Sequence, residues 1–355
     1  MYVKAQKILI VSTTWLGDGV ITVPAISGLR SLFPDAHIAI LARDTIADLF
    51  RAVPAVDEII PFVKKGGAGK PGTILKTAGL LRKRSFDLVV MFPRSLGTAL
   101  MCCIARIPLR IGFKTGLRGM FLTEPIREDR RVRSVHQMHY YEKLISPLGD
   151  ARFPELPVLV LPDRERQWAR AYLHSRCGDT RAPLVGINPG STYGEAKQWP
   201  VERFAELSRK LSEKHGCKVI IFGDAAASVQ AKTINRALDG RALDVTGRTT
   251  ILQLAALLSC CTVLVTNDTG PMHVACAVQT PVVAIFGSTD PIATGPLGDK
   301  ATILRDKLPC SPCLRRTCPE GHLRCMKNVP VENAVNAVLQ QLQDYPPSAM
   351  ETYMI

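Results

Sequence analysis

The sequence predicts an α/β protein built from two domains, each with a mainly parallel sheet, and three observations support this class. Short apolar runs alternate with longer helical patterns over most of the 355 residues. The strand-like runs are continuously apolar, as expected of parallel strands covered by helices on both faces. The length exceeds what one ordinary core holds and fits two domains of about 150 to 180 residues.

The N-terminal half contains four strand–helix units. The expected strands, each with the helix that follows it, are 7–11 and 20–32, 37–41 and 45–52, 58–62 and 73–83, and 87–91 and 96–106. The pattern weakens over residues 110–133. A helix over 136–148 and then Pro154, Pro157 and Pro162 indicate the end of a domain and a linker. We therefore expect an N-terminal domain over residues 1–160.

The alternation restarts at residue 184. The expected strands are 184–187, 218–222, 244–245, 262–265 and 282–285, and the expected helices are 201–215, 225–238, 251–258, 271–277 and 331–342. This predicts a C-terminal domain over 161–345 and a polar tail over 346–355. Ligands of open α/β sheets bind beyond the carboxyl ends of the strands, so two domains that face each other would place these loops across one cleft.

Composition and charge narrow the class of partner. The chain is 46% hydrophobic and 21% charged, and no apolar run reaches the roughly 18 residues of a membrane span. Its start lacks a signal-peptide cleavage site, so we expect a cytoplasmic protein. The net charge of +14 predicts an anionic partner, and residues 64–133 carry 16 basic against 4 acidic residues. Phosphorylated small molecules or an anionic membrane surface fit this basic region. No nucleic-acid motif accompanies it, so we expect no nucleic acid.

The most informative loop follows the expected strand 262–265. It reads Thr266-Asn267-Asp268-Thr269-Gly270-Pro271-Met272-His273 and opens directly onto a helix. Thr269 can cap that helix, Gly270 allows close approach to the backbone, and Pro271 suits a first helical turn. Free N–H groups and the positive end of the helix dipole then favour an anion. An ordinary strand-to-helix turn is the alternative.

A second loop, residues 188–200, follows the expected strand 184–187. Gly190, Ser191 and Thr192 can offer N–H and hydroxyl donors to phosphate oxygens, and Lys197 adds a positive charge. A diphosphate could thus be held without a metal, whereas a solvated loop is the alternative. The pair at 199–200, Trp-Pro, argues against that alternative because it pins the end of the loop.

The loop after the first strand, residues 12–19, has neither the glycine spacing of a dinucleotide site nor a P-loop lysine. It offers a carboxylate instead: Asp18, between Gly17 and Gly19, could act as a general base. The alternative is a helix N-cap aspartate.

The 11 cysteines fall into two groups. Seven lie in apolar surroundings and are expected to act as small core residues. The other four, Cys310, Cys313, Cys318 and Cys325, occur with a histidine in a proline-rich segment. They could bind structural zinc or form a redox knot, although the second pair lacks the usual tight spacing, or they could be free thiols.

Four motifs together closely resemble the family 9 glycosyltransferases, the ADP-heptose:lipopolysaccharide heptosyltransferases, and within them the heptosyltransferase II group. The resemblance covers nearly the whole chain. The motifs are Thr14-Trp15-Leu16-Gly17-Asp18, Phe92-Pro93-Arg94-Ser95, Asn188-Pro189-Gly190 with Ala196-Lys197-Gln198-Trp199-Pro200, and Thr266-Asn267-Asp268-Thr269-Gly270 with Met272-His273-Val274-Ala275.

The resemblance implies a GT-B fold of two Rossmann-like domains and an inverting transfer that needs no metal or other cofactor. It implies that the C-terminal domain binds ADP-L-glycero-D-manno-heptose. Asp18 would be the general base, Lys197 would contact the donor, and Thr269 and Gly270 would hold its diphosphate. The other expected donor contacts are Gly190, Ser191, Thr192, Asn267, Asp268, Met272 and His273.

The resemblance also implies that the N-terminal domain binds the lipopolysaccharide inner core, an acceptor that carries Kdo carboxylates. We expect Arg94, Ser95 and Arg110 to contact it, and the basic surface to hold the protein peripherally at the anionic inner membrane. The cysteine segment is not part of the shared catalytic pattern. Three alternatives remain: heptosyltransferase I, a later-acting family 9 transferase, and a non-catalytic ADP-binding scaffold.

Overall fold

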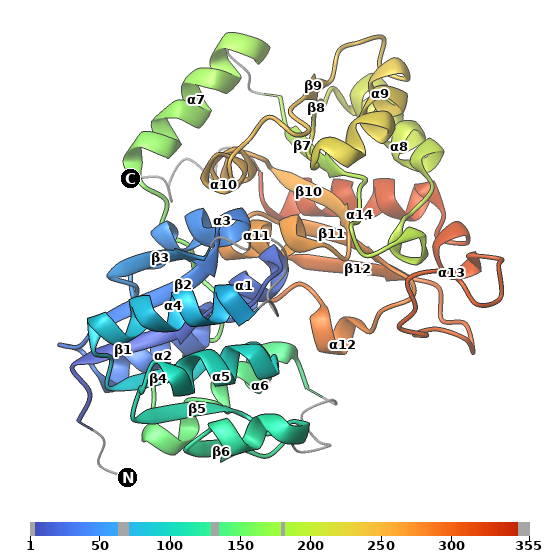
Figure 1. Ribbon diagram of the computed structural model, residues 1–355. Helices are drawn as coiled ribbons and strands as arrows, with labels where there is room; N and C mark the ends of the chain where they lie inside the picture. The colour runs from blue at the N-terminus through green and yellow to red at the C-terminus, as the bar shows by residue number, and fades with distance from the viewer. Residues whose placement is uncertain (1–3, 63–70, 129–134, 179–181, 347–355) are drawn as a thin grey trace. The chain divides into compact units, whose positions relative to one another are not determined.

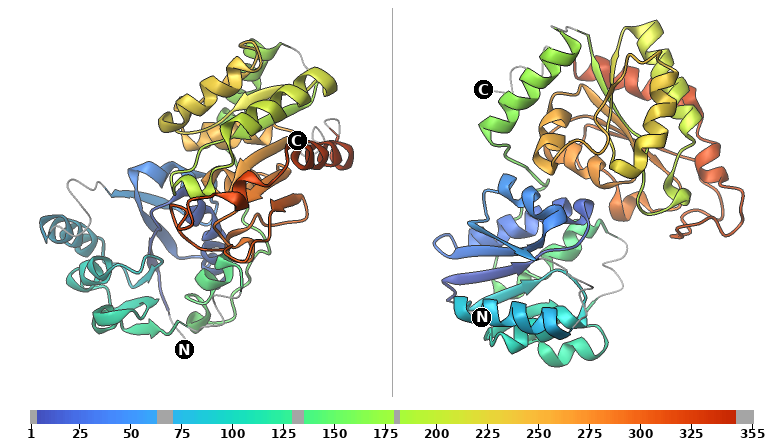
Figure 2. Two further views of the ribbon diagram at one scale, coloured as in Figure 1. Left: turned by 90° about the vertical axis from the view of Figure 1, so that its right-hand side faces the viewer. Right: turned by 45° about the horizontal axis from the view of Figure 1, so that its top comes forward.

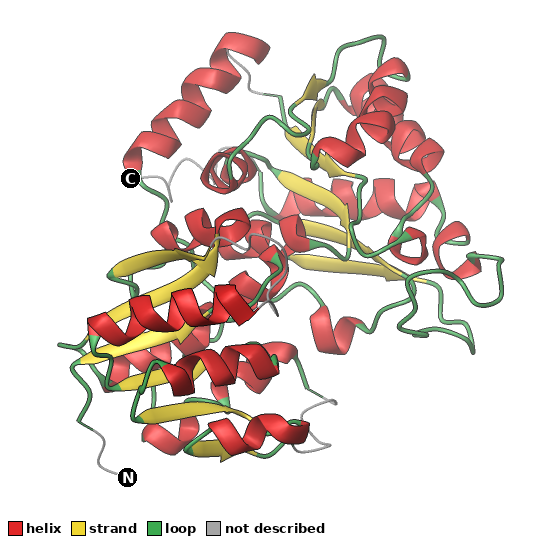
Figure 3. Ribbon diagram, in the orientation of Figure 1, coloured by secondary structure: helices red, strands yellow, loops and turns green. Residues whose placement is uncertain are grey.

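The computed structural model describes residues 4–62, 71–128, 135–178 and 182–346. The chain divides into two compact units, Met1–Val160 and Leu161–Ile355. Each unit contains one six-stranded parallel sheet between layers of helices (Figures 1 and 3). Nearly all of the expected tail lies outside the described residues.

The sheet of the N-terminal unit has the strand order β3-β2-β1-β4-β5-β6, and all neighbours are parallel. Its strands are β1 Lys7–Val11, β2 His37–Arg43, β3 Glu58–Phe62, β4 Leu88–Met91, β5 Leu109–Phe113 and β6 Glu124–Ile126. This is the doubly wound order of the Rossmann fold, in which the winding reverses between the first and fourth strands. The predicted fold class is therefore confirmed for this unit.

Helices cover both faces of this sheet because successive strand residues point to opposite sides. Leu9 and Met91 pack with α4 Pro71–Arg84 and α5 Leu96–Ile104 on one face. Ile8 and Ile10 are fully buried toward the other face. Figure 1 shows α2 and α6 on that face. The remaining helices are α1 Leu16–Ile21, α2 Val23–Leu32, α3 Asp44–Ala47, η1 Asp48–Ala52, η2 Gly116–Phe121, α6 Gln137–Glu142 and η4 Ser146–Leu148.

The C-terminal unit repeats the same winding, with the order β12-β11-β10-β7-β8-β9. Its strands are β7 Leu184–Asn188, β8 Lys218–Ile221, β9 Leu243–Asp244, β10 Val263–Asn267, β11 Val282–Phe286 and β12 Ala301–Arg305. Counted from β7, this is again the Rossmann order, and the winding reverses between β7 and β10.

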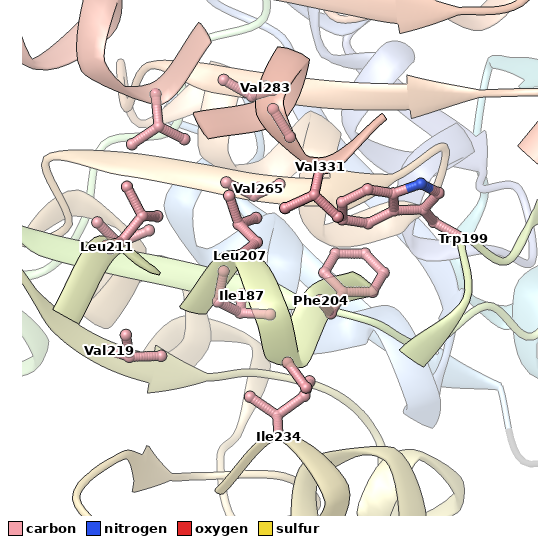
Figure 4. Close-up of a cluster of buried hydrophobic side chains, with 14 of the residues drawn as sticks. Ile187, Trp199, Phe204, Leu207, Leu211, Val219, Ile234, Val265, Val283 and Val331 are labelled. Carbon is pink, nitrogen blue, oxygen red and sulfur yellow. The ribbon is translucent and has the colours of Figure 1, made fainter. Parts of the chain in front are cut away.

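One hydrophobic cluster joins one face of this sheet to α8 Val201–His215, α9 Ser228–Arg236 and α14 Val331–Asp344 (Figure 4). On the other side, α7 Asp163–Cys177 packs against α10 Ile251–Ser259 (Figure 2). The remaining helices are η5 Glu195–Lys197, η6 Ala225–Ala227, α11 Gly270–Ala277, α12 Pro291–Thr294 and α13 Arg324–Lys327.

Several elements differ from the sequence prediction. The stretch 110–133 contains β5 and β6, whose signal is weak because β6 has three residues and buries only Ile126. Helix α7 lies between the expected linker and residue 184, where the sequence predicted no element. It is mostly charged and buries only Ala169, so it lacks the apolar stripe from which a helix can be predicted. The strand β12 was also missed, since none of its residues is fully buried. The expected helix 20–32 is two helices that meet at Thr22, just before Pro24.

Among the described residues, no helix combines the length and apolarity needed to cross a bilayer.

Candidate functional site

The predicted donor loops lie at the switch point of the C-terminal sheet. They follow β7 and β10, which are neighbouring parallel strands with Thr266 opposite Asn188. The carboxyl ends of these strands meet at the position where doubly wound sheets bind ligands. Two loops that lie about 80 residues apart in the sequence therefore form one site.

Asparagine side chains join the two loops. The Asn188 Nδ2 atom donates hydrogen bonds of 2.9 Å to the hydroxyls of Thr266 and Thr269. The Asn267 side-chain amide accepts from the main-chain N–H of Trp199 at 3.0 Å and donates to the Pro189 carbonyl at 2.8 Å. Asn267 was expected to contact the donor, but both ends of its amide hold the loop in place.

Helix α11 begins at Gly270 and has Thr269 at its N-cap, with Pro271 in the first turn as expected. No side chain caps it, because the Thr269 hydroxyl interacts with Thr266 and with the Asn267 carbonyl instead of the helix N–H groups. The positive end of the helix dipole is therefore open to an anion.

Lys197 and Asp268 form an ion pair within the site. The Lys197 Nζ atom lies 2.6 Å from Asp268 Oδ2, and the two side chains are 12% and 4% exposed. The same carboxylate oxygen accepts from Thr289 at 2.6 Å and from Thr294 at 3.3 Å. The Lys197 ammonium also lies 4.6 Å from the centre of the Tyr193 ring. These contacts fix the cation beside the N-terminus of α11.

The end of the loop 188–200 is anchored in the domain core, as expected. Trp199 is 1% exposed and packs edge to face against Phe204, with ring centres 4.9 Å apart (Figure 4). Its indole N–H donates to the Val329 carbonyl at 3.1 Å. Lys197 thus stands two residues from a rigid anchor, which limits how far its backbone can move.

The other expected donor residues differ in accessibility. Gly190 and Ser191 are half-buried, Thr192 is exposed, and the Ser191 hydroxyl has no partner among the described residues. His273 is buried at 5% exposure. Met272 is fully buried, as are most residues of α11, so its side chain is not exposed in this structure and its contact with the donor stays a prediction.

Asp18 lies at the switch point of the N-terminal sheet, in the helix that follows β1. It is the third residue of α1 and is half-buried, and Trp15 is the N-cap. The alternative of an N-cap aspartate is therefore wrong. The pKa of Tyr141 is raised mainly by burial and also by the charge of Asp18, so this tyrosine lies near the Asp18 carboxylate.

The loop after β4, on the other side of the same switch point, carries Arg94 and Ser95. The Arg94 Nε atom donates to the Tyr140 hydroxyl at 2.6 Å, and its Nη2 atom pairs with Glu128. Ser95 is exposed and is the N-cap of α5. Because β1 and β4 are neighbouring parallel strands, the loop with Arg94 and Ser95 follows the strand next to the one that leads into Asp18.

Arg110 lies elsewhere. It pairs with Val89 near the start of β5, at the opposite end of the sheet from the loop after β4. Its guanidinium donates to the carbonyls of Phe121 and Ile107 at 2.8 and 2.5 Å. The structure does not bring Arg110 together with Arg94, and its contacts are those of a residue that holds the turns around β5.

Arg118 is a buried cation near Arg94 and Tyr140 that the sequence did not single out. It is 1% exposed, donates to the Phe113 carbonyl at the end of β5, and has no described partner at Nε or Nη2. Burial lowers its pKa, and Tyr140 and Arg94 also act on it electrostatically. The sequence does not show which of the 16 basic residues in 64–133 is buried, because tertiary packing decides this.

Of the seven cysteines expected in the core, Cys102, Cys217 and Cys261 are buried, whereas Cys103, Cys177, Cys260 and Cys276 are half-buried. Burial raises the pKa of Cys102 to about 12. In the second group Cys310 is exposed, Cys313 and Cys318 are half-buried, and Cys325 is buried in α13. No group of three or more potential ligands is arranged to hold a metal ion among the residues that the structure describes.

Comparison with known proteins identifies the class. Residues 74–324 match glycosyltransferase family 9 (heptosyltransferase). The chain is 30% identical to lipooligosaccharide heptosyltransferase 2 of Haemophilus influenzae and to lipopolysaccharide heptosyltransferase 2 of Escherichia coli, with 84% of this chain and 88% of each relative covered. It superposes on the structure of E. coli ADP-heptose lps heptosyltransferase II with a TM-score of 0.82 and 26% identity, covering 95% of this chain and 99% of that chain.

The two Rossmann-like units and these matches define a glycosyltransferase of the GT-B class. The chain belongs to glycosyltransferase family 9, the heptosyltransferases. The predicted family, fold class and enzyme class are confirmed, and the relatives named above support the heptosyltransferase II group.

Proposed function

We propose that the protein transfers L-glycero-D-manno-heptose from ADP-L-glycero-D-manno-heptose to the heptose/Kdo inner core of lipopolysaccharide, with inversion at the anomeric carbon. The observation that carries this proposal is the convergence of an open helix N-terminus and the Lys197–Asp268 pair at the switch point of the C-terminal sheet. The names of the similar proteins supply the sugar and the acceptor class.

The donor site supports departure of ADP without a divalent ion. Negative charge grows on the diphosphate as the glycosidic bond breaks, and fixed N–H dipoles and a lysine stabilise that charge more than the ground state. Lys197 is held by Asp268 and Tyr193, so little reorganisation is needed as the charge develops. We infer that catalysis requires no metal.

Asp18 is proposed to take the proton from the acceptor hydroxyl as that oxygen attacks the anomeric carbon. Its support is its position in the first turn of α1 at the switch point of the N-terminal sheet. Arg94 and Ser95 in the neighbouring loop are proposed to bind the acid groups of the acceptor, and the basic residues of this unit to favour the anionic leaflet of the inner membrane.

The test is product formation with defined substrates. Purified protein is incubated with ADP-heptose and with truncated acceptors that end in Kdo or in heptose, and products are identified by mass spectrometry. We expect heptose transfer to the heptose-ended acceptor, with turnover unchanged by a chelator added at assay time. Transfer only to the Kdo-ended acceptor would indicate heptosyltransferase I, and no product with any acceptor would support a scaffold.

A further inference from the structure

The segment between β12 and α13, residues 306–323, has no hydrophobic core of its own. It contains turns but no helix or strand, and none of its residues is buried. Loops of this length without secondary structure are uncommon in compact domains unless something else stabilises them. The segment carries Cys310, Cys313, Cys318 and His322, and Cys325 follows in the first helical turn of α13.

Contacts around Gly287 bring parts of this segment together. The Ser311 hydroxyl donates to the Gly287 carbonyl at 2.7 Å and the Leu314 N–H donates to the Ser288 carbonyl at 2.7 Å, so the chain on both sides of Cys313 is held there. A Cβ atom on Gly287 would lie 3.1 Å from Cys325 Sγ, which places Cys325 at the same residues. The Leu323 N–H donates to Cys318 Sγ at 3.5 Å. Main-chain N–H groups directed at a sulfur stabilise a thiolate, which is the form that ligates metals.

The histidine acts as a donor to the cluster. The Arg324 N–H donates to His322 Nδ1 at 3.0 Å, so the proton of the neutral ring is on Nε2. That Nε2 atom lies 3.9 Å from Cys310 Sγ. An N–H group in this position can hydrogen-bond to a thiolate but cannot ligate a metal, which leaves the four cysteines as the ligand set.

We propose that Cys310, Cys313, Cys318 and Cys325 bind one divalent ion of the zinc type through four sulfurs, with His322 donating a hydrogen bond to Cys310. Thiolates prefer soft or borderline ions in tetrahedral geometry. As described, the side chains do not form a ligand group. Binding therefore requires side chains of the unburied loop 306–323 to move toward Cys325, which lies in the core cluster of the unit.

The site has a consequence for the donor loop, because the residues between Cys313 and Cys318 pack on it. The Ala196 N–H donates to the Arg316 carbonyl at 3.2 Å, and the Tyr193 hydroxyl donates to the Leu314 carbonyl at 2.9 Å. The Leu314 N–H in turn bonds the Ser288 carbonyl at 2.7 Å. An ion bound on both sides of this stretch would therefore hold Lys197 in place through its own loop.

The experiment measures metal content in the full-length protein. Protein is purified without chelator, and zinc, iron and other metals are quantified per chain. It is then stripped with a chelator under reducing conditions and titrated with Zn²⁺ or Co²⁺. We expect about one equivalent of metal per chain and, with Co²⁺, the visible absorption of a tetrahedral sulfur site. Failure of the wild-type protein to retain or rebind a metal, or a disulfide among these cysteines after purification, would overturn the proposal.

Variants locate the ligands. Cys318→Ser and Cys310→Ser are expected to lose most of the bound metal, whereas Cys177→Ser, a half-buried cysteine of α7, keeps it. His322→Gln should retain the metal and weaken its binding, by roughly 10- to 100-fold for an outer-shell partner. Equal loss of metal in Cys177→Ser would refute the assignment. Titration of stripped wild-type protein keeps the test valid if a variant does not fold.

The effect on the donor loop rests on the proposed function and is measured separately. Stripped protein should bind ADP about tenfold more weakly if its donor loop is ordered one tenth of the time, and Zn²⁺ should restore the affinity. Metal binding with no ADP binding at all would reject the proposed function and leave the metal site intact. Metal binding with unchanged ADP affinity would reject only the coupling.

Discussion

Lys197 and Asp268 offer a test that separates stability from catalysis. Substitution of Lys197 by methionine keeps the volume of the side chain and removes its charge. The Asp268 carboxylate, 4% exposed, then keeps the hydroxyls of Thr289 and Thr294 but loses its only described cation. Breaking a buried pair by removing one partner costs about 3–5 kcal/mol. For a unit of this size about 2–4 °C is lost per kcal/mol, so we expect Tm to fall by roughly 6–20 °C.

The double variant Lys197→Met with Asp268→Asn removes both charges. We expect it to recover most of the lost stability, because no unpaired charge remains buried. Its kcat should stay about 10²–10³-fold below wild type, since the cation that stabilises the departing diphosphate is missing. Differential scanning calorimetry gives Tm, and ADP release from ADP-heptose gives kcat. Lys232→Met, an exposed lysine of α9, is the matched control and should change neither quantity.

Two outcomes would refute this reasoning. An unchanged Tm in the single variant would mean that the ion pair contributes nothing to folding. Recovery of kcat together with Tm in the double variant would mean that Lys197 serves only to neutralise Asp268, and the electrostatic role proposed for it would have to be dropped.

Three further predictions concern other parts of the chain. Asp18→Asn should lower kcat by about 10²–10⁴-fold and leave ADP affinity, measured by calorimetry, unchanged; a parallel loss of ADP binding would make Asp18 structural. Gly194→Ala should weaken ADP binding, because φ there is +146° and a Cβ atom would lie 2.4 Å from the Arg316 carbonyl oxygen; Gly216→Ala, at φ +64° with open space around it, is the control and should leave ADP affinity intact. Hydrogen bonding to Arg84 lowers the pKa of Glu58 below 4.5 in the folded protein. The resulting stabilisation is present above pH 4.5 and is lost as pH falls through the folded-state pKa. The Tm difference between wild type and Glu58→Gln should therefore shrink on acidification, and a difference independent of pH would contradict the linkage.

Much of the fold could be predicted from the sequence because buried parallel strands read as continuous apolar runs. Both sheets were expected on this basis, and the runs at 7–11 and 58–62 match β1 and β3. The elements that were missed bury few residues: α7 buries one, and β12 none fully. Their positions are set by packing against neighbours, which leaves little trace in local periodicity.

The candidate site shows the same division. The loops after β7 and β10 were recognisable because polar, glycine-containing turns follow apolar strands there. The sequence did not show that these two loops form one site, because that depends on the strand order that makes β7 and β10 neighbours. The partners of Lys197 at Asp268 and Tyr193, and the difference between Arg94 and Arg110, likewise follow from the sheet and not from spacing along the chain.

By itself the sequence determined the class of this protein: its alternating apolar runs, its anion-favouring turns and its four shared motifs are local properties of neighbouring residues. The tertiary structure decided which polar groups are free to act. In the folded chain Asn267 and Arg110 form hydrogen bonds that hold loops in place. Met272 and Arg118 are buried, and the N-terminus of α11 has no side-chain cap. The physical reason is that burial and hydrogen-bond partners arise from contacts between residues far apart in the chain, and these contacts exist only once the sheets have formed.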